Sequence, residues 1–468
     1  MDVGNEVTFK ARVCRVLSLI AAVIVSILPS VASAKTNGPA SAEDIRRTLA
    51  AYITAHPKAM LALGAIRGGK SLTYFVRGTD EASFPLDDRT LFEIGSVEKT
   101  FVATLLAQMV QSGSVRLNDP IQEYLPPGIV APRYKGISIT LASLAEHRSG
   151  LPGNPPNLAS KDFSNPYAGY TIGMLYSALD HYKLIRAPGA RYEYSNFAYG
   201  LLGQLLANRA HEPFATLIEK HILSPLRMND TAVVGTPLSK HRLAPAFTYG
   251  GAPQGAWDLG ALSPAGSMQS NLHDMLVYLR ANIDAPAGPL GRAMSFAQRS
   301  RVPEDDEDSI GLAWETNLRY RFVHKAGGTG GYSALIVIDR RRHYGMMFLA
   351  NVANSAELGQ LMQHLITPAD VAAPTYWAFI KKQPSLFSGD YPIPANGPHF
   401  ALSIFKYRGK LYVQTPQSSP EQLGERKRGR YSWSSVKAII TFSHATGGRV
   451  TGLTVLQDGQ NTRAQKKP

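Results

Sequence analysis

Strand-like and helix-like segments are segregated along residues 40–368, and this order limits the folds available to the chain more than any other feature. The segments are, in chain order, a helical pattern over 41–56, β-rich runs over 59–67 and 71–78, a long stretch with several amphipathic helices, three β-rich runs from about Tyr320, and a closing helix over 355–367. The spacing predicts a hairpin at one end and an antiparallel meander at the other. We therefore expect an α+β fold in which both ends share one antiparallel sheet, flanked by the N- and C-terminal helices, with a mostly helical second subdomain and a cleft between sheet and helices.

The composition changes again after about residue 375. Short alternating strands joined by glycine turns fill the remainder of the chain. This pattern predicts a separate small all-β domain over 375–468, barrel-like or sandwich-like, after a main domain over 35–368.

The first 34 residues have the layout of a secretory signal peptide. Lys10, Arg12 and Arg15 precede a 13-residue apolar run, and Ala-Ser-Ala at 32–34 supplies a small-residue cleavage site. The run is short for a membrane-spanning helix, which needs about 20 residues. We predict an exported, periplasmic protein, with an uncleaved N-terminal anchor as the alternative. The only cysteine, Cys14, lies in the signal, which leaves the mature chain without disulfides, thiol catalysis or cysteine-bound metal.

The chain is basic, with a formal net charge of +14, but the positive charge is spread along the sequence. An exported basic protein meets anionic envelope polymers and lipid headgroups rather than nucleic acid. We therefore predict no nucleic-acid partner, and we interpret the basic segments as solvated surface that can associate with the envelope membrane.

Residues 64–71, with the sequence GAIRGGKS, match the phosphate-binding loop pattern G-x-x-x-x-G-K-[ST] at every fixed position. That motif binds phosphate because its Lys and Ser begin a helix whose N-terminus faces the anion. Here residues 72–76 read Leu-Thr-Tyr-Phe-Val, which is a strand composition. The sequence therefore predicts a hairpin turn at Gly68 and Gly69 rather than a nucleotide site.

A Ser-x-x-Lys pattern, Ser96 to Lys99, opens the strongly periodic helical segment 96–113. On a helix the two side chains lie one turn apart on the same side, where a desolvated lysine has a lowered pKa and can accept the serine proton. The alternative is a capping serine beside a solvated lysine. The same pattern recurs in two strand-like runs, where residues three apart face opposite ways, at Ser403/Lys406 and Ser434/Lys437.

Two further motifs follow in order, Tyr194-Ser195-Asn196 and Lys325-Ala326-Gly327. The order Ser-x-x-Lys, Tyr-x-Asn, Lys-x-Gly resembles the serine β-lactamase and penicillin-binding protein superfamily. The tyrosine in the middle motif resembles its class C β-lactamase branch, which also holds D-alanyl-D-alanine carboxypeptidases, D-aminopeptidases and esterases. Segments such as LNDPIQEYLPPG, LAEHRSGLP and HKAGGTGGYSA also resemble family signatures in family order, and the resemblance covers about residues 40–368.

The resemblance implies a role for each matching residue. Ser96 is expected to be the acylated nucleophile, Lys99 its general base or proton relay, and Tyr194 the group that passes a proton to the leaving nitrogen. The expected substrate contacts are Asn196, which holds the substrate amide, Lys325, which sets the electrostatic field, and Gly327, Gly328 and Thr329, with the backbone N–H groups of Ser96 and Gly328 as the oxyanion hole. It implies no metal and no cofactor. The implied partners are β-lactams, D-amino-acid peptides and peptidoglycan. His147 and His324 lie beside these signatures, and we interpret both as structural.

The third motif departs from the family pattern, because Ala326 replaces the usual Thr or Ser, whose hydroxyl helps to bind a substrate carboxylate. Thr329 and Ser333 are candidates to replace it, and no arginine occurs in 351–365 to serve as another carboxylate contact. We predict an exported serine hydrolase that acts through an acyl-serine on β-lactams or D-Ala-type cell-wall peptides. The alternatives are an esterase or D-aminopeptidase on the same machinery, and a β-lactam sensor that acylates but turns over slowly.

Overall fold

The structure is a computed structural model that describes residues 39–81, 83–158, 164–234, 240–374, 385–393, 401–415, 420–426, 429–433, 438–445, 448–457 and 460–467. The predicted signal peptide and the Ser434/Lys437 pair lie outside the described residues. Within these ranges, no helix is long and apolar enough to cross a membrane.

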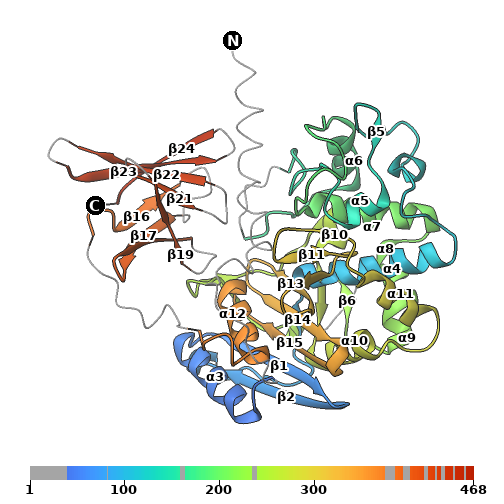
Figure 1. The fold of residues 1–468 in the computed structure, drawn as a ribbon, viewed down its shortest axis with the longest axis horizontal. Coiled ribbons are helices and arrows are strands. Elements are labelled where there is room, and N and C mark those ends of the chain that lie inside the picture. Colours follow the sequence, from blue (N-terminus) through green and yellow to red (C-terminus); the bar gives the residue numbers. More distant parts are fainter. Residues whose placement is uncertain are drawn as a thin grey trace.

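The central element is an antiparallel sheet of eight strands in the order β10-β11-β12-β13-β14-β15-β1-β2 (Figure 1). Its long strands are β1 (Met60–Arg67), β2 (Lys70–Arg77), β13 (Val323–Gly328), β14 (Ser333–Asp339) and β15 (Tyr344–Ala350). Because β1 pairs with β15, the N-terminal hairpin and the later meander form one sheet, as the sequence predicts. Three short strands that the sequence analysis did not identify extend the edge, β10 (Val302–Pro303), β11 (Asp308–Ile310) and β12 (Glu315–Asn317).

The segment that resembles a phosphate-binding loop is the β1–β2 hairpin. Gly68 and Gly69 form its two-residue turn with φ values of 54° and 77°, a conformation that favours glycine. Arg67 pairs directly with Lys70, so Lys70 and Ser71 begin a strand instead of a helix. The prediction of a hairpin turn is confirmed.

Helices cover both faces of the sheet. Helices α3 (Ala42–Ala55) and α12 (Ser355–Ile366) share one apolar cluster with Leu61 and Leu63 of β1. The alternate residues Ala62 and Ile66 belong to the other cluster, with helices α4 (Glu98–Gln111), α7 (Asn196–Ala210) and α10 (Leu272–Asp284). This division follows from the two-residue period of a strand, which sends successive side chains to opposite faces.

The helical subdomain lies between β2 and β10 in the chain. Besides α4, α7 and α10 it contains α5 (Leu141–Ala145), α6 (Ile172–Asp180), α8 (Phe214–Ile218), α9 (Ser224–Leu226) and α11 (Pro289–Ala297). Its short strands are β3 (Phe92–Glu93), β4 (Arg133–Tyr134), β5 (Ile137–Ser138), β6 (Ala232–Val233), β7 (Ala246–Phe247), β8 (Pro253–Gln254) and β9 (Met268–Ser270).

The C-terminal part contains only strands among its described residues. One sheet holds β16 (Gly389–Pro392), β17 (Ala401–Tyr407), β18 (Lys410–Gln414) and β19 (Glu421–Gln422). The other holds β20 (Gly424–Arg426), β21 (Arg430–Trp433), β22 (Ala438–His444), β23 (Val450–Gln457) and β24 (Gln460–Gln465). Both sheets contribute to one apolar cluster that includes Leu402 and Ile440, which agrees with the predicted all-β composition.

Candidate active site

Three glycines allow the backbone of β13 to lie against the turn that carries Ser96. The chain leaves β3 through Gly95, with φ 50°, into a single 3-10 turn, Gly95–Val97, which continues directly as α4. A Cβ atom on Gly95 would lie 2.6 Å from the Gly328 nitrogen, and one on Gly327 would lie 2.1 Å from the Ile94 oxygen. A Cβ on Gly266 would lie 3.0 Å from the Gly95 carbonyl carbon. Backbone segments therefore pack closely around Ser96, and a side chain larger than glycine at these three positions would prevent this packing.

Lys99 is completely buried, and its Nζ has three oxygen partners. It lies 2.9 Å from Ser96 Oγ and 2.9 Å from Asn196 Oδ1, and it also donates to the carbonyl oxygen of Ala265. The two carbonyl oxygens can only accept, so two N–H bonds of Lys99 are committed to them. The third position on the nitrogen faces Ser96 Oγ.

The surroundings of Lys99 favour its neutral form. Burial, followed by the nearby charge of Lys325, holds the pKa of Lys99 well below its ordinary value of 10.5. Among the described residues Lys99 forms no ion pair. The adjacent carboxyl of Glu98 is also fully buried, and burial raises its pKa to about 8 even though its Oε2 accepts a hydrogen bond from Met268 N. Glu98 is therefore mostly protonated at neutral pH, and a neutral Lys99 has a lone pair to accept the Ser96 proton.

The middle motif supplies Tyr194 and Asn196 from the start of α7. The Tyr194 hydroxyl donates to Ser96 Oγ at 2.6 Å. Burial raises the pKa of Tyr194 to about 12, against the opposing influence of Lys325 and Ser96, so the phenol keeps its proton at neutral pH. Ser195 caps α7 with its hydroxyl, which fixes where Asn196 enters the site. The Asn196 Nδ2 lies 3.4 Å from Asn154 Oδ1 and 3.5 Å from the Tyr167 hydroxyl.

Lys325 approaches Tyr194 from the opposite side, on β13. It is 1% exposed, its Nζ lies 5.0 Å from the centre of the Tyr194 ring, and it forms an ion pair with Glu315 Oε1 at 2.6 Å. Burial alone lowers the pKa of Lys325, but the charge and hydrogen bond of Glu315, together with Tyr194 and Glu304, outweigh burial and raise it overall. The site therefore keeps a fixed positive charge at Lys325.

His147 supports the tyrosine. Its ring is stacked on the Tyr194 ring, with a centroid distance of 4.3 Å, and its Nδ1 accepts the backbone N–H of Ser195 at 3.0 Å. Burial and the charges of Lys325 and Lys99 hold the pKa of His147 well below its usual 6.5. His324 lies 3.4 Å from Glu315 Oε2 and 3.6 Å from Asp308 Oδ1. These contacts are consistent with the structural interpretation of both histidines.

The end of the third motif offers few side-chain donors to a substrate. Ala326 belongs to the apolar cluster beneath α12, on the face of the sheet opposite Lys325. Thr329 is 1% exposed, and its hydroxyl lies beside the buried carboxyl of Glu93, whose pKa it helps to lower against the effect of burial. Ser333 is also 1% exposed, and its hydroxyl is bonded to Val352 O at 2.8 Å and to Asn354 N at 2.9 Å. As the structure stands, neither hydroxyl is open to a substrate.

Three groups at this site were not anticipated from the sequence. The Glu315 carboxylate forms an ion pair with Lys325. The Ala265 carbonyl accepts a hydrogen bond from Lys99, and the buried Glu98 carboxyl lies next to Lys99 in the chain. Only Glu98 gave a signal, since it stands inside the Ser-x-x-Lys motif at a position that the helical period turns inward. Among the described residues, no group of three or more His, Cys, Asp or Glu side chains is arranged to hold a metal ion.

A buried lysine and a protonated tyrosine on one serine hydroxyl define a class of serine hydrolase that works without histidine. The comparisons agree: residues 45–370 match the model of the Beta-lactamase family, and the chain belongs to that family. It is 30% identical over 272 residues to the D-alanyl-D-alanine-carboxypeptidase/endopeptidase AmpH of Escherichia coli K12, covering 55% of this chain and 69% of that protein.

Solved structures show the same fold. A beta-lactamase/D-alanine carboxypeptidase from Yersinia pestis superposes with a TM-score of 0.60 at 22% identity, covering 70% of this chain and 99% of that one. A class C beta lactamase from Rhodobacter sphaeroides gives a TM-score of 0.56 at 22% identity, covering 66% and 94%. The C-terminal sheets lie beyond the family match.

Proposed function

We propose that the protein is an exported serine hydrolase that forms an acyl intermediate on Ser96 with β-lactams or D-Ala-type cell-wall peptides. One observation carries the proposal. Lys99 donates to two carbonyl oxygens, so the third position on its nitrogen is left for Ser96, and no carboxylate among the described residues forms an ion pair with it.

The proposed acylation uses these groups in turn. Ser96 Oγ attacks the substrate carbonyl carbon while its proton passes to Lys99 Nζ. The oxyanion that forms is held by the backbone N–H groups of Ser96 and Gly328. Tyr194 then gives its proton to the leaving nitrogen as the C–N bond breaks, and the resulting phenolate takes up the proton that Lys99 accepted from Ser96, which restores both groups. In deacylation, water takes the place of the leaving amine and attacks the acyl carbon. The proton of the water passes to the Tyr194 and Lys99 pair, and Ser96 Oγ regains a proton from Lys99 as it leaves.

The remaining residues position the substrate in this proposal. Asn196 Oδ1 is bonded to Lys99, so Asn196 binds the substrate amide carbonyl through Nδ2, which exchanges one of its long contacts with Asn154 and Tyr167 for the substrate. The positive charge of Lys325 lies close to the Tyr194 ring and stabilises the transient phenolate of Tyr194. Gly327, Gly328 and Thr329 line the substrate through their backbone. The signal-like segment 1–34 and the periplasmic location that it implies belong to the same proposal.

An esterase or D-aminopeptidase is the second candidate, and the third motif favours it. Ala326 has no hydroxyl, and those of Thr329 and Ser333 are buried. Losing a hydrogen bond to a carboxylate costs about 1.5–3 kcal/mol, which is roughly 10- to 100-fold in affinity. Acyl transfer to Ser96 does not depend on that contact, so an ester or a D-amino-acid amide without a carboxylate is also a suitable substrate.

Incubation with nitrocefin and with a fluorescent penicillin, followed by intact-mass measurement, tests the proposal. Nitrocefin turnover supports a β-lactamase, and a lasting penicillin adduct on Ser96 supports a slow carboxypeptidase or a sensor. Hydrolysis of p-nitrophenyl esters without either result supports the esterase. If Ser96→Ala retains whichever activity is found, Ser96 is not the nucleophile and the proposal is wrong.

A further inference from the structure

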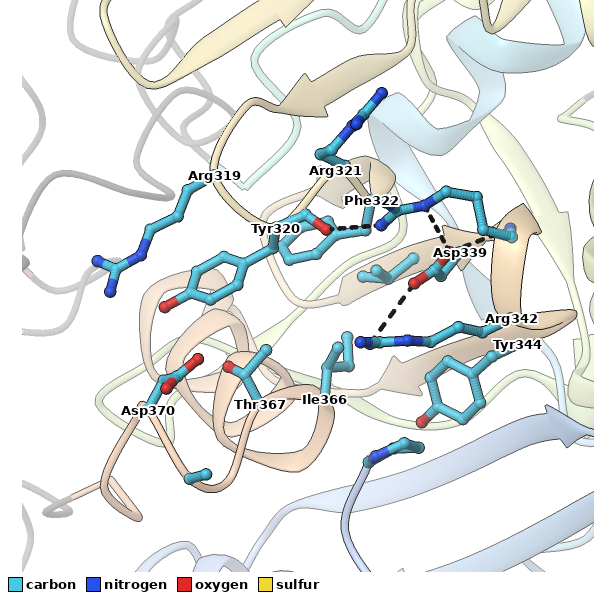
Figure 2. Close-up of a pocket in the computed structure, with 14 residues that line it drawn as sticks. Arg319, Tyr320, Arg321, Phe322, Asp339, Arg342, Tyr344, Ile366, Thr367 and Asp370 are labelled. Atoms are coloured by element: carbon cyan, nitrogen blue, oxygen red, sulfur yellow. Dashed lines mark hydrogen bonds and ion pairs between the residues drawn. The ribbon is translucent and has the colours of Figure 1, made fainter. Parts of the chain in front are cut away.

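A cavity lies at the end of β13 and β14 that is remote from the candidate active site. Gly328 and Ser333, which pair with each other, mark the active-site end of these strands, whereas Asp339 marks the other end. The cavity lies there, between the β12–β13 turn, the β14–β15 turn and the end of α12, and has a volume of about 200 Å³ (Figure 2). An engineered cavity of about 150 Å³ holds a benzene molecule, so this one has room for a small ring or a three-carbon chain with a substituent.

The cavity is lined by an excess of positive charge. Arg319, Arg321, Arg341 and Arg342 face two carboxylates, Asp339 and Asp370, which leaves two positive charges. Asp339 is 5% exposed and lies 3.5 Å from Arg341 Nε and 3.6 Å from Arg342 Nη1. Arg341 Nη2 also donates to Tyr320 O at 3.2 Å, and the side chains of Arg341 and Arg342 are 54% and 42% exposed, so these contacts hold the two guanidinium groups at one wall and leave some of their donors open.

The other two arginines stand at the rim. Arg319 and Arg321 are exposed and form no ion pair among the described residues, and Figure 2 shows both directed outward from the cavity. Arg319 lies 5.2 Å from the centre of the Tyr320 ring, and that ring is stacked on Phe322. Their long side chains can rotate onto a ligand that occupies the cavity.

Three polar atoms in the wall are buried without a hydrogen-bond partner. They are the hydroxyls of Tyr344 and Tyr320 and the Oδ1 of Asp370. Tyr344 is only 5% exposed, so bulk water does not readily form a hydrogen bond with its hydroxyl. A buried polar atom without a partner costs free energy, and such atoms in a cavity wall indicate a ligand that supplies partners.

We propose that this cavity binds a phosphate ester that carries free hydroxyl groups, such as a phosphorylated glycerol or sugar. A phosphate monoester has nearly two negative charges and three oxygens, which match the two excess charges and guanidinium groups that approach from two chain segments. A single carboxylate would engage only one of these segments. The Asp370 carboxylate, which repels phosphate, accepts a hydrogen bond from a ligand hydroxyl, and the Tyr344 hydroxyl donates to a phosphate oxygen.

The test is isothermal titration calorimetry of the purified protein with glycerol 3-phosphate, glycerol and inorganic phosphate at low ionic strength. We expect glycerol 3-phosphate to bind at least about tenfold more tightly than either fragment. Arg342→Gln and Arg319→Gln should each weaken it by roughly tenfold, and Arg292→Gln, an exposed arginine of α11 outside the cavity, should not. Arg319→Gln keeps the test valid if Arg342→Gln unfolds the protein, because Arg319 is exposed and forms no ion pair with any residue that the structure describes.

Vesicles distinguish the source of the phosphate. Flotation with phosphatidylglycerol vesicles, compared with phosphatidylcholine, supports a lipid headgroup if binding is lost in the same two variants. Binding of glycerol 3-phosphate without vesicle binding supports a soluble ligand. Equal binding of glycerol 3-phosphate to the wild type and both variants, or no binding to the wild type of either the soluble ester or the vesicles, overturns the proposal.

Discussion

Tyr194 lies between two buried lysines whose surroundings differ in one respect. The Nζ atoms of Lys99, on α4, and Lys325, on β13, each lie 5.0 Å from the centre of its ring. Within the part of the chain that the structure describes, the partners of Lys99 are uncharged oxygens, whereas Lys325 has the carboxylate of Glu315 at 2.6 Å. Burial acts on both lysines in the same direction, but the pKa of Lys99 is lowered and that of Lys325 is raised. Glu315 makes the largest contribution that raises the pKa of Lys325, with smaller ones from Tyr194 and Glu304, and it thereby separates a fixed charge from a base.

Glu98 is the apparent exception on the Lys99 side. It is the residue next to Lys99, yet burial raises its pKa to about 8, so that it is largely uncharged at neutral pH. A protonated Glu98 cannot act as a counter-ion in the way that Glu315 does. The difference between the two sides therefore depends on burial of Glu98 as well as on the position of Glu315.

The largest effect is expected on replacing Lys99. Lys99→Met removes the proposed base, and general base catalysis contributes about 10²- to 10⁴-fold, so kcat/KM for the best ester or β-lactam substrate should fall by that factor. Lys406→Met is the matched control, since Lys406 belongs to the Ser-x-x-Lys pattern on β17, where Ser403 is bonded to Asp390 instead. A Lys99→Met enzyme within tenfold of the wild type would exclude Lys99 as the base.

The next largest effect is expected on the free energy of unfolding, which should depend on pH because of Glu98. Its pKa is about 8 in the folded protein, against 4.5 as its ordinary value, so between these values the folded state binds more protons than the unfolded state. Stability should then fall as pH rises through this window, by up to about 1.4 kcal/mol per pH unit. Glu98→Gln, which mimics the protonated carboxyl, should remove this part of the slope.

Urea unfolding at pH 6 and pH 8 measures the slope for Glu98. Glu43→Gln on the exposed face of α3 is the control, and it should keep the wild-type slope. Equal slopes in Glu98→Gln and wild type would mean that Glu98 is ionised in the folded protein. The contrast between the two lysines would then need another explanation.

These cases show what could be predicted from the sequence. The segregated strands and helices predicted the shared sheet, and the helical period around Ser96 predicted that Ser96 and Lys99 face each other, because both depend on residues close in the chain. Glu315 was missed because β12 has only three residues, too few for an alternating pattern. The Ala265 carbonyl was missed because a backbone acceptor 166 residues away leaves no trace in residue type.

A smaller effect is expected on the Lys325 side. Glu315→Gln removes the negative charge, so burial should lower the pKa of Lys325 and the positive charge should be lost at lower pH. We expect kcat/KM to fall by roughly 10- to 100-fold and its alkaline limb to move to lower pH, since a shift of one pKa unit corresponds to about 1.4 kcal/mol. Glu315→Asp keeps the charge and should keep most of the alkaline limb. An unchanged pH profile in Glu315→Gln would show that Lys325 does not depend on its carboxylate.

The smallest effect is expected at the end of β13, where Thr329 was a candidate to replace the hydroxyl missing at Ala326. The Thr329 hydroxyl is buried beside the Glu93 carboxyl, so Thr329→Val should change kcat/KM by less than about twofold and cost about 0.5–1.5 kcal/mol of stability, the net contribution of one hydrogen bond. Paired substrates with and without a carboxylate beside the scissile bond provide the measurement. A loss of tenfold or more confined to the carboxylate-bearing substrate would mean that Thr329 turns toward the ligand on binding. The Lys325 side would then recognise the substrate carboxylate through Thr329, in addition to supplying a charge, and the argument for an esterase would lose its main support.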